Sequence, residues 1–368
     1  MEEVGHEMSE KLWGEENVIL FGENLKVYFS LARSLSEIIT FKKARYVRAV
    51  DGVTLYLPRN KVTCLVGESG CGKTTLGRAM IGLVKPVSGR IYYKPSSKEI
   101  IDLIEEKMIP KKGDFYDITD VPGDVYKLLR RELQIVFQDP YGSLNPRMTI
   151  KEILEEPLII HRIGESESER LEMVIKALQD VKLTPPEEFL NLYPFQLSGG
   201  QRQRVNIARA LILGAKVIVA DEPVSMLDVS IRSEILKLML DLMQTKDLTY
   251  LFITHDLAVA NIICDYLNIM YLGKIVESGP TDEVIKNPKH PYTQALLAAV
   301  PMPDPKGRWH IKEVPIKGEV PSAINIPSGC RFHPRCLYAF DKCYTQEPPY
   351  FEVGPRHYSQ CWLHEIKR

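Results

Sequence analysis

Four short apolar runs divide the first 255 residues of the chain. They are TCLV (63 to 66), QIVF (134 to 137), VIVA (217 to 220) and LFIT (251 to 254). A continuous apolar run of this length is typical of a strand buried on both faces. Helical patterns separate the runs, notably TTLGRAMIGL after the first and IRSEILKLMLDLMQT before the last. The alternation predicts an α/β fold, with a mostly parallel sheet and crossover helices.

Polar residues follow each apolar run. They are Gly67, Gln138, Asp221 with Glu222, and His255. Ligands of open α/β sheets bind outside the carboxyl ends of the strands, so we expect these side chains to converge on one site. Taken singly, Gln138 and His255 could equally be structural residues of their turns. Their significance comes from order and position together.

The first polar stretch, GESGCGKT, matches the phosphate-binding pattern G-x-x-x-x-G-K-[ST] between a strand and a helix. Its backbone N–H groups would close around phosphates, Lys73 would add a positive charge, and the Thr74 hydroxyl would ligate Mg²⁺. A chance glycine-rich turn is the alternative, but the flanking strand and helix argue against it. The residues expected to contact nucleotide here are Gly67, Ser69, Gly70, Cys71, Gly72, Lys73, Thr74 and Thr75.

VIVADE places two carboxylates at one strand end. Asp221 is positioned to hold Mg²⁺, and Glu222 to orient and deprotonate an attacking water. Acidic residues after a strand are also common helix caps, and Pro223 makes that plausible for one of the two. It does not explain the pair.

A second glycine-rich turn, LSGGQRQRV (197 to 205), leads into another helix. Free backbone N–H groups at a helix start make a ready anion site. Because the chain already has one phosphate loop, we expect the second turn to bind the phosphate of a different ligand.

Composition and charge exclude several classes of protein. Lys and Arg total 47 against 48 Asp and Glu, so the chain lacks the basic footprint of a nucleic-acid-binding protein. The acidic start MEEVGHEMSEKLWGEEN has no signal-peptide core, and no apolar run approaches the roughly 18 residues of a membrane span. We expect no nucleic-acid partner and a chain kept in the cytosol.

The 368 residues allow one large domain and an appendage. We assign 1–21 to an N-terminal extension, 22–285 to the main domain with a helical subdomain at about 139–212, and 286–368 to a C-terminal extension. Within that extension a separate small module begins near residue 300. Residues 94–127 mix Pro, Gly and charge with weak periodicity, which suggests a surface excursion.

In order, the chain carries GESGCGKTT, FQDP, LSGGQRQRV, VIVADEP, SMLD and THD, and it resembles an ATP-binding cassette (ABC) ATPase over residues 22 to 285. The resemblance implies a P-loop NTPase fold with an antiparallel β subdomain and an inserted helical subdomain. It also implies that two cassettes pack head to tail. The LSGGQ turn of one subunit would then close over the ATP held by the other.

The resemblance assigns roles residue by residue. Glu222, His255 and Gln138 would be catalytic, with His255 at the γ-phosphate and Gln138 at Mg²⁺ beside Thr74 and Asp221. An aromatic residue would stack on adenine, with Tyr46 the first candidate and Phe41 the second. The residues that would act on the partner's ATP are Ser198, Gly199, Gly200, Gln201 and Asp228.

Two further stretches, FQDPYGSLNPRMT and HPYTQALLAAVPMPDP, resemble the oligopeptide/dipeptide branch of importer ATPases, as does the terminal pattern GCRFHPRC. The branch implies a second homologous ATPase subunit, two membrane permeases, an external solute-binding protein and a place at the cytoplasmic face of the membrane. The solute could be a peptide, an oligosaccharide or nickel. Permease contact is expected near 139 to 165, unless the apolar group there is an ordinary core turn: Pro140, Tyr141, Leu144 and Met148.

Four of the seven cysteines crowd the end of the chain: Cys330, Cys336, Cys343 and Cys361. Five, six and seventeen residues separate them, so there is no C-x₂-C pair of the kind most structural zinc sites use. Four thiolates suit Zn²⁺ or an iron–sulfur cluster, and the resemblance favours [4Fe–4S] over zinc and over unligated cysteines.

Two rival functions remain at this point. A non-transport ABC ATPase, of the DNA-repair or translation type, would carry two cassettes or a long coiled coil, and neither is apparent. A P-loop metabolic kinase would leave LSGGQ unexplained.

Overall fold

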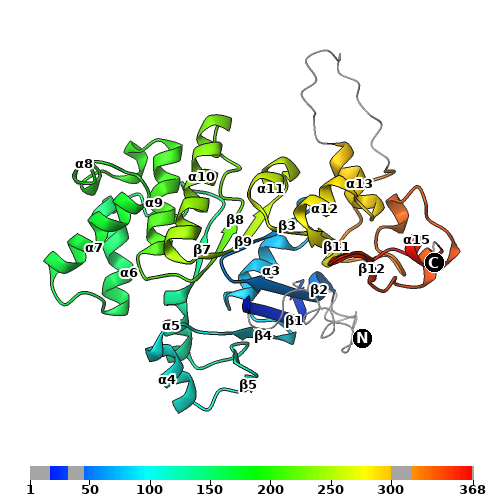
Figure 1. Cartoon of the computed structure of the whole chain (residues 1–368), viewed down its shortest axis with the longest axis horizontal. Coiled ribbons are helices and arrows are strands. Elements are labelled where there is room, and N and C mark those ends of the chain that lie inside the picture. Colours follow the sequence, from blue (N-terminus) through cyan, green and yellow to red (C-terminus); the bar gives the residue numbers. More distant parts are fainter. Residues whose placement is uncertain (1–16, 32–44, 300–315, 367–368) are drawn as a thin grey trace, which may run out of the picture.

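The computed structural model describes residues 17–31, 45–299 and 316–366, which form two sheets with helices around them (Figure 1). The larger sheet has eight strands in the order β12-β13-β11-β10-β3-β9-β8-β7. The five from β10 to β7 run parallel to one another. Six strands of this sheet are β3 (Val62–Val66), β7 (Leu133–Val136), β8 (Val217–Asp221), β9 (Thr249–Thr254), β10 (Tyr266–Tyr271) and β11 (Lys274–Pro280).

The four predicted strands are confirmed as β3, β7, β8 and β9, which are neighbours in the sheet. Their side chains alternate between two hydrophobic cores. Val217 and Val219 pack on the face that carries α3 (Lys73–Met80), whereas Ile218 and Ala220 pack on the other face, in the core that includes α10 (Val229–Lys246). Burial on both faces explains why these strands read as continuous apolar runs.

The second sheet is antiparallel, with strand order β2-β1-β4-β6-β5. Its bounds are β1 (Val18–Ser30), β2 (Tyr46–Pro58), β4 (Ser88–Tyr93), β5 (Lys111–Lys112) and β6 (Phe115–Asp117). The first strand begins at Val18, inside the range assigned to the N-terminal extension.

Residues 94–127 are not a loose surface excursion. They contain helix α4 (Lys98–Glu106), the β5–β6 hairpin and the start of α5 (Gly123–Glu132). Ile100 and Ile104 are buried in the core that also holds Leu76 of α3, and Phe115 packs with Val18 and Phe21 of β1, so the segment extends the antiparallel sheet and shares its core. Its apolar residues are few and its elements short, which hid the pattern from the sequence.

The helical subdomain lies on one side of the central sheet, at the left of Figure 1. Its elements are α6 (Ile150–His161), α7 (Glu167–Asp180), α8 (Glu187–Leu190), the 3₁₀ helix Pro194–Gln196 and α9 (Gly199–Leu211). A capping box between Thr149 and Glu152 starts α6, because each residue's side chain bonds the other's backbone N–H. The helical content expected between Gln138 and LSGGQ is present.

Residues 316–366, here called the tail, lie on the opposite side of the sheet (Figure 1). Two helices precede the tail, α12 (Thr281–Lys286) and α13 (Pro291–Ala298). The elements of the tail are the 3₁₀ helix His333–Arg335, α14 (Asp341–Thr345), β12 (Phe351–Gly354), β13 (His357–Ser359) and α15 (Leu363–Ile366). Strand β13 pairs with β11, so the tail continues the central sheet and does not stand apart from it. Phe332 of the tail packs edge-on against Tyr271 of β10, which fastens the two parts together.

Two further features concern membrane spans and cysteine pairing. No helix in the described ranges is long and apolar enough to cross a membrane. Cys64 of β3 and Cys264, just after α11 (Leu257–Ile263), form a disulfide with their Cα atoms 5.9 Å apart. No sequence pattern pairs them, because they lie 200 positions apart in the chain.

Candidate functional site

The polar strand ends converge at Glu222, as expected. Gln138 Nε2 donates to Glu222 Oε2 over 3.1 Å, and His255 Nδ1 lies 3.0 Å from the same oxygen. The three residues follow β7, β8 and β9, which are adjacent in the sheet, so strand order alone brings them together. The Glu222 side chain is 15% exposed and that of His255 58%, and Gln138 is exposed as well, so this Glu222 cluster opens to solvent through Gln138 and His255.

The phosphate loop, residues 67–75, joins β3 to α3. A Cβ at Gly67 would lie 2.2 Å from the Met270 carbonyl oxygen, and one at Gly72 only 2.0 Å from that of Ala49. The backbone path therefore requires glycine at both positions. Lys73 Nζ donates to the Gly67 and Glu68 carbonyls at 2.7 and 3.0 Å, which holds the amine within the curl of the loop.

Asp221 joins the phosphate loop to the Glu222 cluster. Its Oδ1 accepts a hydrogen bond from the Thr74 hydroxyl at 2.8 Å. Burial raises the pKa of the Asp221 carboxyl, and the bond from Thr74 and the charge of Arg78 only partly offset this. A bound cation would favour the ionised form, so the Asp221–Thr74 pair suits a divalent metal such as Mg²⁺.

The signature turn, residues 197–201, begins α9. The Ser198 hydroxyl accepts from the Gln201 N–H at 3.2 Å, and the Gln201 side chain accepts from the Ser198 N–H at 2.9 Å. Gly200 packs against Ile231 of α10, where a Cβ would lie 2.6 Å from a methyl group. Ser198 and Asp228 are exposed, so the turn presents a helix start to solvent, separate from the Glu222 cluster.

The remaining nucleotide and permease candidates are placed as follows. Tyr46, the first residue of β2, is 47% exposed, and Phe41 lies outside the described residues. Of the apolar group after Gln138, Pro140 and Leu144 are buried, whereas Tyr141 is 59% exposed and stacks on the Arg202 guanidinium. The buried members serve the core, so only part of that group faces outward.

The four tail cysteines are brought near one another. Burial raises the pKa of the Cys330 and Cys361 thiols to about 12, and the charges of the other tail cysteines add to the rise in both. Cys336, Cys343 and Cys361 are each 8% exposed. Among the described residues, however, no group of three or more Cys, His, Asp or Glu side chains is arranged to hold a metal ion.

Sequence reasoning missed one set of residues at the phosphate loop. Arg335 of the tail forms an ion pair with Glu68, and the Tyr292 hydroxyl accepts from the Glu68 N–H at 2.9 Å. Glu68 occupies a variable position of the phosphate-loop pattern, and Arg335 lies 267 positions further along the chain. No local pattern could therefore have linked the two.

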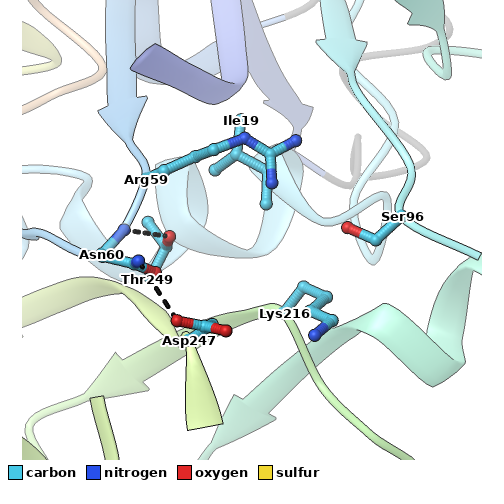
Figure 2. A pocket seen from close by; sticks show the side chains of 7 residues that line it. All are labelled: Ile19, Arg59, Asn60, Ser96, Lys216, Asp247 and Thr249. Atoms are coloured by element: carbon cyan, nitrogen blue, oxygen red, sulfur yellow. Dashed lines mark hydrogen bonds between the residues drawn. The ribbon is translucent and has the colours of Figure 1, made fainter. Parts of the chain in front are cut away.

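A cavity of about 290 Å³ opens at the opposite ends of the parallel strands from the Glu222 cluster (Figure 2). Lys216 precedes β8, Thr249 begins β9 and Asn60 lies just before β3, so the cavity sits at the amino ends of the parallel strands. Asn60 bridges Thr249 and Asp247 with hydrogen bonds of 3.1 and 3.4 Å. None of the predicted site residues lines this cavity, and the candidate site remains at the carboxyl ends.

Comparison with known proteins identifies the class of protein that has this fold and site. Residues 50–225 match the family model for the ABC transporter, and residues 276–343 match that for the C-terminal region of oligopeptide/dipeptide transporters. The dimeric ATP-binding cassette MJ0796, solved in a post-hydrolysis state with ADP and Pi, is 27% identical with a TM-score of 0.56 and covers 72% of this chain and 99% of its own. The fold and the site define a cassette ATPase.

Two curated relatives narrow the assignment. The oligopeptide transport ATP-binding protein AppF of Bacillus subtilis is 43% identical over 95% of this chain and 98% of its own length. The dipeptide transport ATP-binding protein DppF of Haemophilus influenzae is also 43% identical, over 91% and 93%. The chain belongs to the ABC transporter family, in its oligopeptide/dipeptide branch. It is an ABC-type ATPase coupled to transport, which sets aside the non-transport and kinase alternatives.

Proposed function

We propose that this chain hydrolyses ATP at the Glu222 cluster to drive import of peptides by a membrane transporter. The observation that carries the proposal is the convergence of Gln138, Glu222 and His255 beside the phosphate loop. A carboxylate that accepts from Gln138 and contacts His255 is held where it can orient a water toward a terminal phosphate.

Each residue of the site has a proposed part. Backbone N–H groups of the phosphate loop and Lys73 bind the phosphates, and Tyr46 stacks on the adenine. Thr74, Asp221 and Gln138 would hold Mg²⁺, which supplies charge neutralisation at the phosphates when bound. Glu222 takes the proton of the attacking water, and His255 contacts the γ-phosphate.

The signature turn acts on a second, homologous ATPase subunit. Support comes from the exposure of Ser198 and Asp228, and from the dimeric form in which the similar cassette MJ0796 was solved. A ligand that binds well only between two half-sites favours the closed dimer, so ATP binding and association are linked.

Exposed apolar side chains of the helical subdomain, here called its exposed apolar surface, receive the permeases. Its members are Tyr141 at 59% exposure, Ile159 at 57%, Ile160 at 53%, Tyr193 at 37% and Phe195 at 67%. Tyr193 and Phe195 stack with centroids 5.6 Å apart, which gives a rigid aromatic face to a partner helix. Photo-crosslinkers at positions 141 and 160 should label a permease. Adducts with the second ATPase alone would overturn this contact.

Peptides are the proposed solute class, because the relatives AppF and DppF are an oligopeptide and a dipeptide transport protein. The chain would lie at the cytoplasmic face of the membrane, and an external solute-binding protein would act on it only through the permeases. Uptake of a labelled tripeptide into proteoliposomes that hold the complete transporter should require ATP. Uptake that is equal without ATP would contradict the proposal.

Cys330, Cys336, Cys343 and Cys361 would hold a [4Fe–4S] cluster, with Zn²⁺ the alternative. Their burial and mutual proximity fit such a group, because a cationic centre would compensate the raised thiol pKa values. The cluster's role is structural, because the tail is too small to form a stable hydrophobic core without a metal centre or another cross-link. Anaerobic purification should give a brown protein with iron and sulfide. A colourless protein with one zinc would overturn the assignment.

A further inference from the structure

We propose that the tail sets the affinity of the phosphate loop for nucleotide, with Arg335 as a positioning residue. Arg335 Nη1 lies 2.7 Å from Glu68 Oε2, and Nη2 lies 3.0 Å from Oε1. Two parallel N–H···O bonds fix the carboxylate in angle as well as in distance. The Arg335 side chain is 7% exposed and that of Glu68 28%, so the contact is partly buried and less open to solvent than an ion pair between two surface side chains.

Glu68 is held on three sides. Its side chain is fixed by Arg335, its N–H donates to the hydroxyl of the buried Tyr292, and its carbonyl accepts from Lys73 Nζ at 3.0 Å. It is the second residue of the phosphate loop. Because its side chain and its backbone are both bonded, the Glu68 carboxylate has one fixed place beside the loop.

A second arginine anchors the same stretch of the tail. Arg331 donates to the Asp51 carboxylate of β2 and to the Leu272 carbonyl. The next residue, Gly273, bonds the phosphate loop, because its N–H donates to the Cys71 carbonyl at 2.9 Å. Arg335 thus fastens the tail to the phosphate loop itself, at Glu68, and Arg331 fastens it to the neighbouring segment, at Leu272.

The charges of the two side chains predict how the contact affects ATP affinity. Glu68 places a carboxylate in a loop that must bind a polyanion, and repulsion between like charges would weaken ATP binding. Arg335 neutralises that carboxylate and holds it toward the tail. Removal of Arg335 leaves an uncompensated negative charge beside the phosphates.

The test is equilibrium binding of a fluorescent ATP analogue to the full chain, with KM and kcat of the complete transporter. Arg335→Ala should weaken binding by about tenfold and raise KM, with kcat largely kept. Glu68→Gln should bind no more weakly than the native chain, because the repelling charge is gone. The double variant should return to within about threefold of native affinity. The control is Arg90→Ala, which removes a 2.7 Å ion pair with Asp117 in the antiparallel sheet.

A merely structural contact predicts a different pattern. Arg335→Ala and Glu68→Gln would then weaken binding alike, and the double variant would rescue nothing; that result would overturn the proposal. Native affinity in a folded Arg335→Ala variant would do the same. If Arg335→Ala fails to fold, Glu68→Lys in the phosphate loop replaces it, and weaker binding by that variant would count against the charge argument.

Discussion

At the scale of single residues, the backbone of Glu222 is unusual. Its φ of 47° lies in the left-handed region that side chains other than glycine seldom adopt. The conformation is held because the Glu222 N–H donates to the Ile253 carbonyl of β9 at 2.9 Å. Such strain is concentrated at functional sites, where the surrounding structure fixes it. Here it turns the carboxylate of Glu222 toward Gln138 and His255.

Replacement of Glu222 by glutamine should separate binding from hydrolysis. An amide keeps the size of the side chain but cannot accept a proton from water. We expect turnover of the assembled transporter to fall roughly 10²–10⁴-fold, while ATP affinity stays near native. Glu99→Gln, at an exposed ion pair with Arg131, is the control and should keep full activity. Near-native turnover of Glu222→Gln would remove the proposed role.

At the scale of elements, a buried charge network joins the tail to the cassette. Glu277 of β11 is fully buried and lies 2.7 Å from His357 Nε2 of β13. The same carboxylate accepts from the backbone N–H groups of Lys289 and His290 just before α13. Three elements therefore share one carboxylate, and loss of a single partner would leave a buried charge.

His290 should make the stability of the chain depend on pH. Burial lowers its pKa to about 4, and Nδ1 accepts from the Tyr292 N–H, which favours the neutral ring. A histidine with a depressed folded pKa adds stability above its unfolded pKa of about 6.5, and this is lost as pH falls toward 4. The loss would be on the order of 3 kcal/mol. Denaturant unfolding of the native chain and of His290→Gln between pH 7 and 4.5 should show a flatter pH dependence in the variant. Equal slopes would contradict the assignment.

The signature helix α9 leads to a prediction that concerns the partner. Ser198→Arg places a bulky cation where the second subunit's phosphates would bind. It should abolish hydrolysis at the partner's phosphate loop and leave this chain's own ATP affinity intact. Gln244→Arg adds the same charge to an exposed position of α10 and is the control. Unchanged turnover at the partner's site in a Ser198→Arg assembly would argue against action in trans.

Elements with a local signature were predictable, and those fixed by distant contacts were not. The strands β3, β7, β8 and β9 were found because burial on both faces makes them continuous apolar runs. Strand β10 was missed because YLNIMY mixes aromatic and polar residues, and its Asn268 is buried only because it bonds the Cys64 carbonyl. The Glu222 cluster could be predicted because its residues follow adjacent strands. The Glu68–Arg335 pair could not, because it depends on how the tail packs against the cassette.

At the scale of the whole molecule, the phosphate loop lies between two flanking bodies. The helical subdomain carries the signature turn and the exposed apolar surface, and the tail lies on the other side of the sheet (Figure 1). Gln138 leads from the nucleotide site into the first body, and Arg335 ties the second to the loop. Events at the nucleotide can therefore reach both sides through direct contacts.

The most direct test of this account is the rate of ATP hydrolysis by the purified chain compared with that of the complete transporter. In the proposed trans arrangement each nucleotide site needs the partner's signature turn, so the isolated chain should hydrolyse ATP slowly at low protein concentration. The transporter in proteoliposomes, with a peptide-loaded binding protein, should be faster by at least about tenfold, as expected when positioned groups complete a site. Hydrolysis by the dilute, monomeric chain at the rate of the full assembly would contradict the central claim.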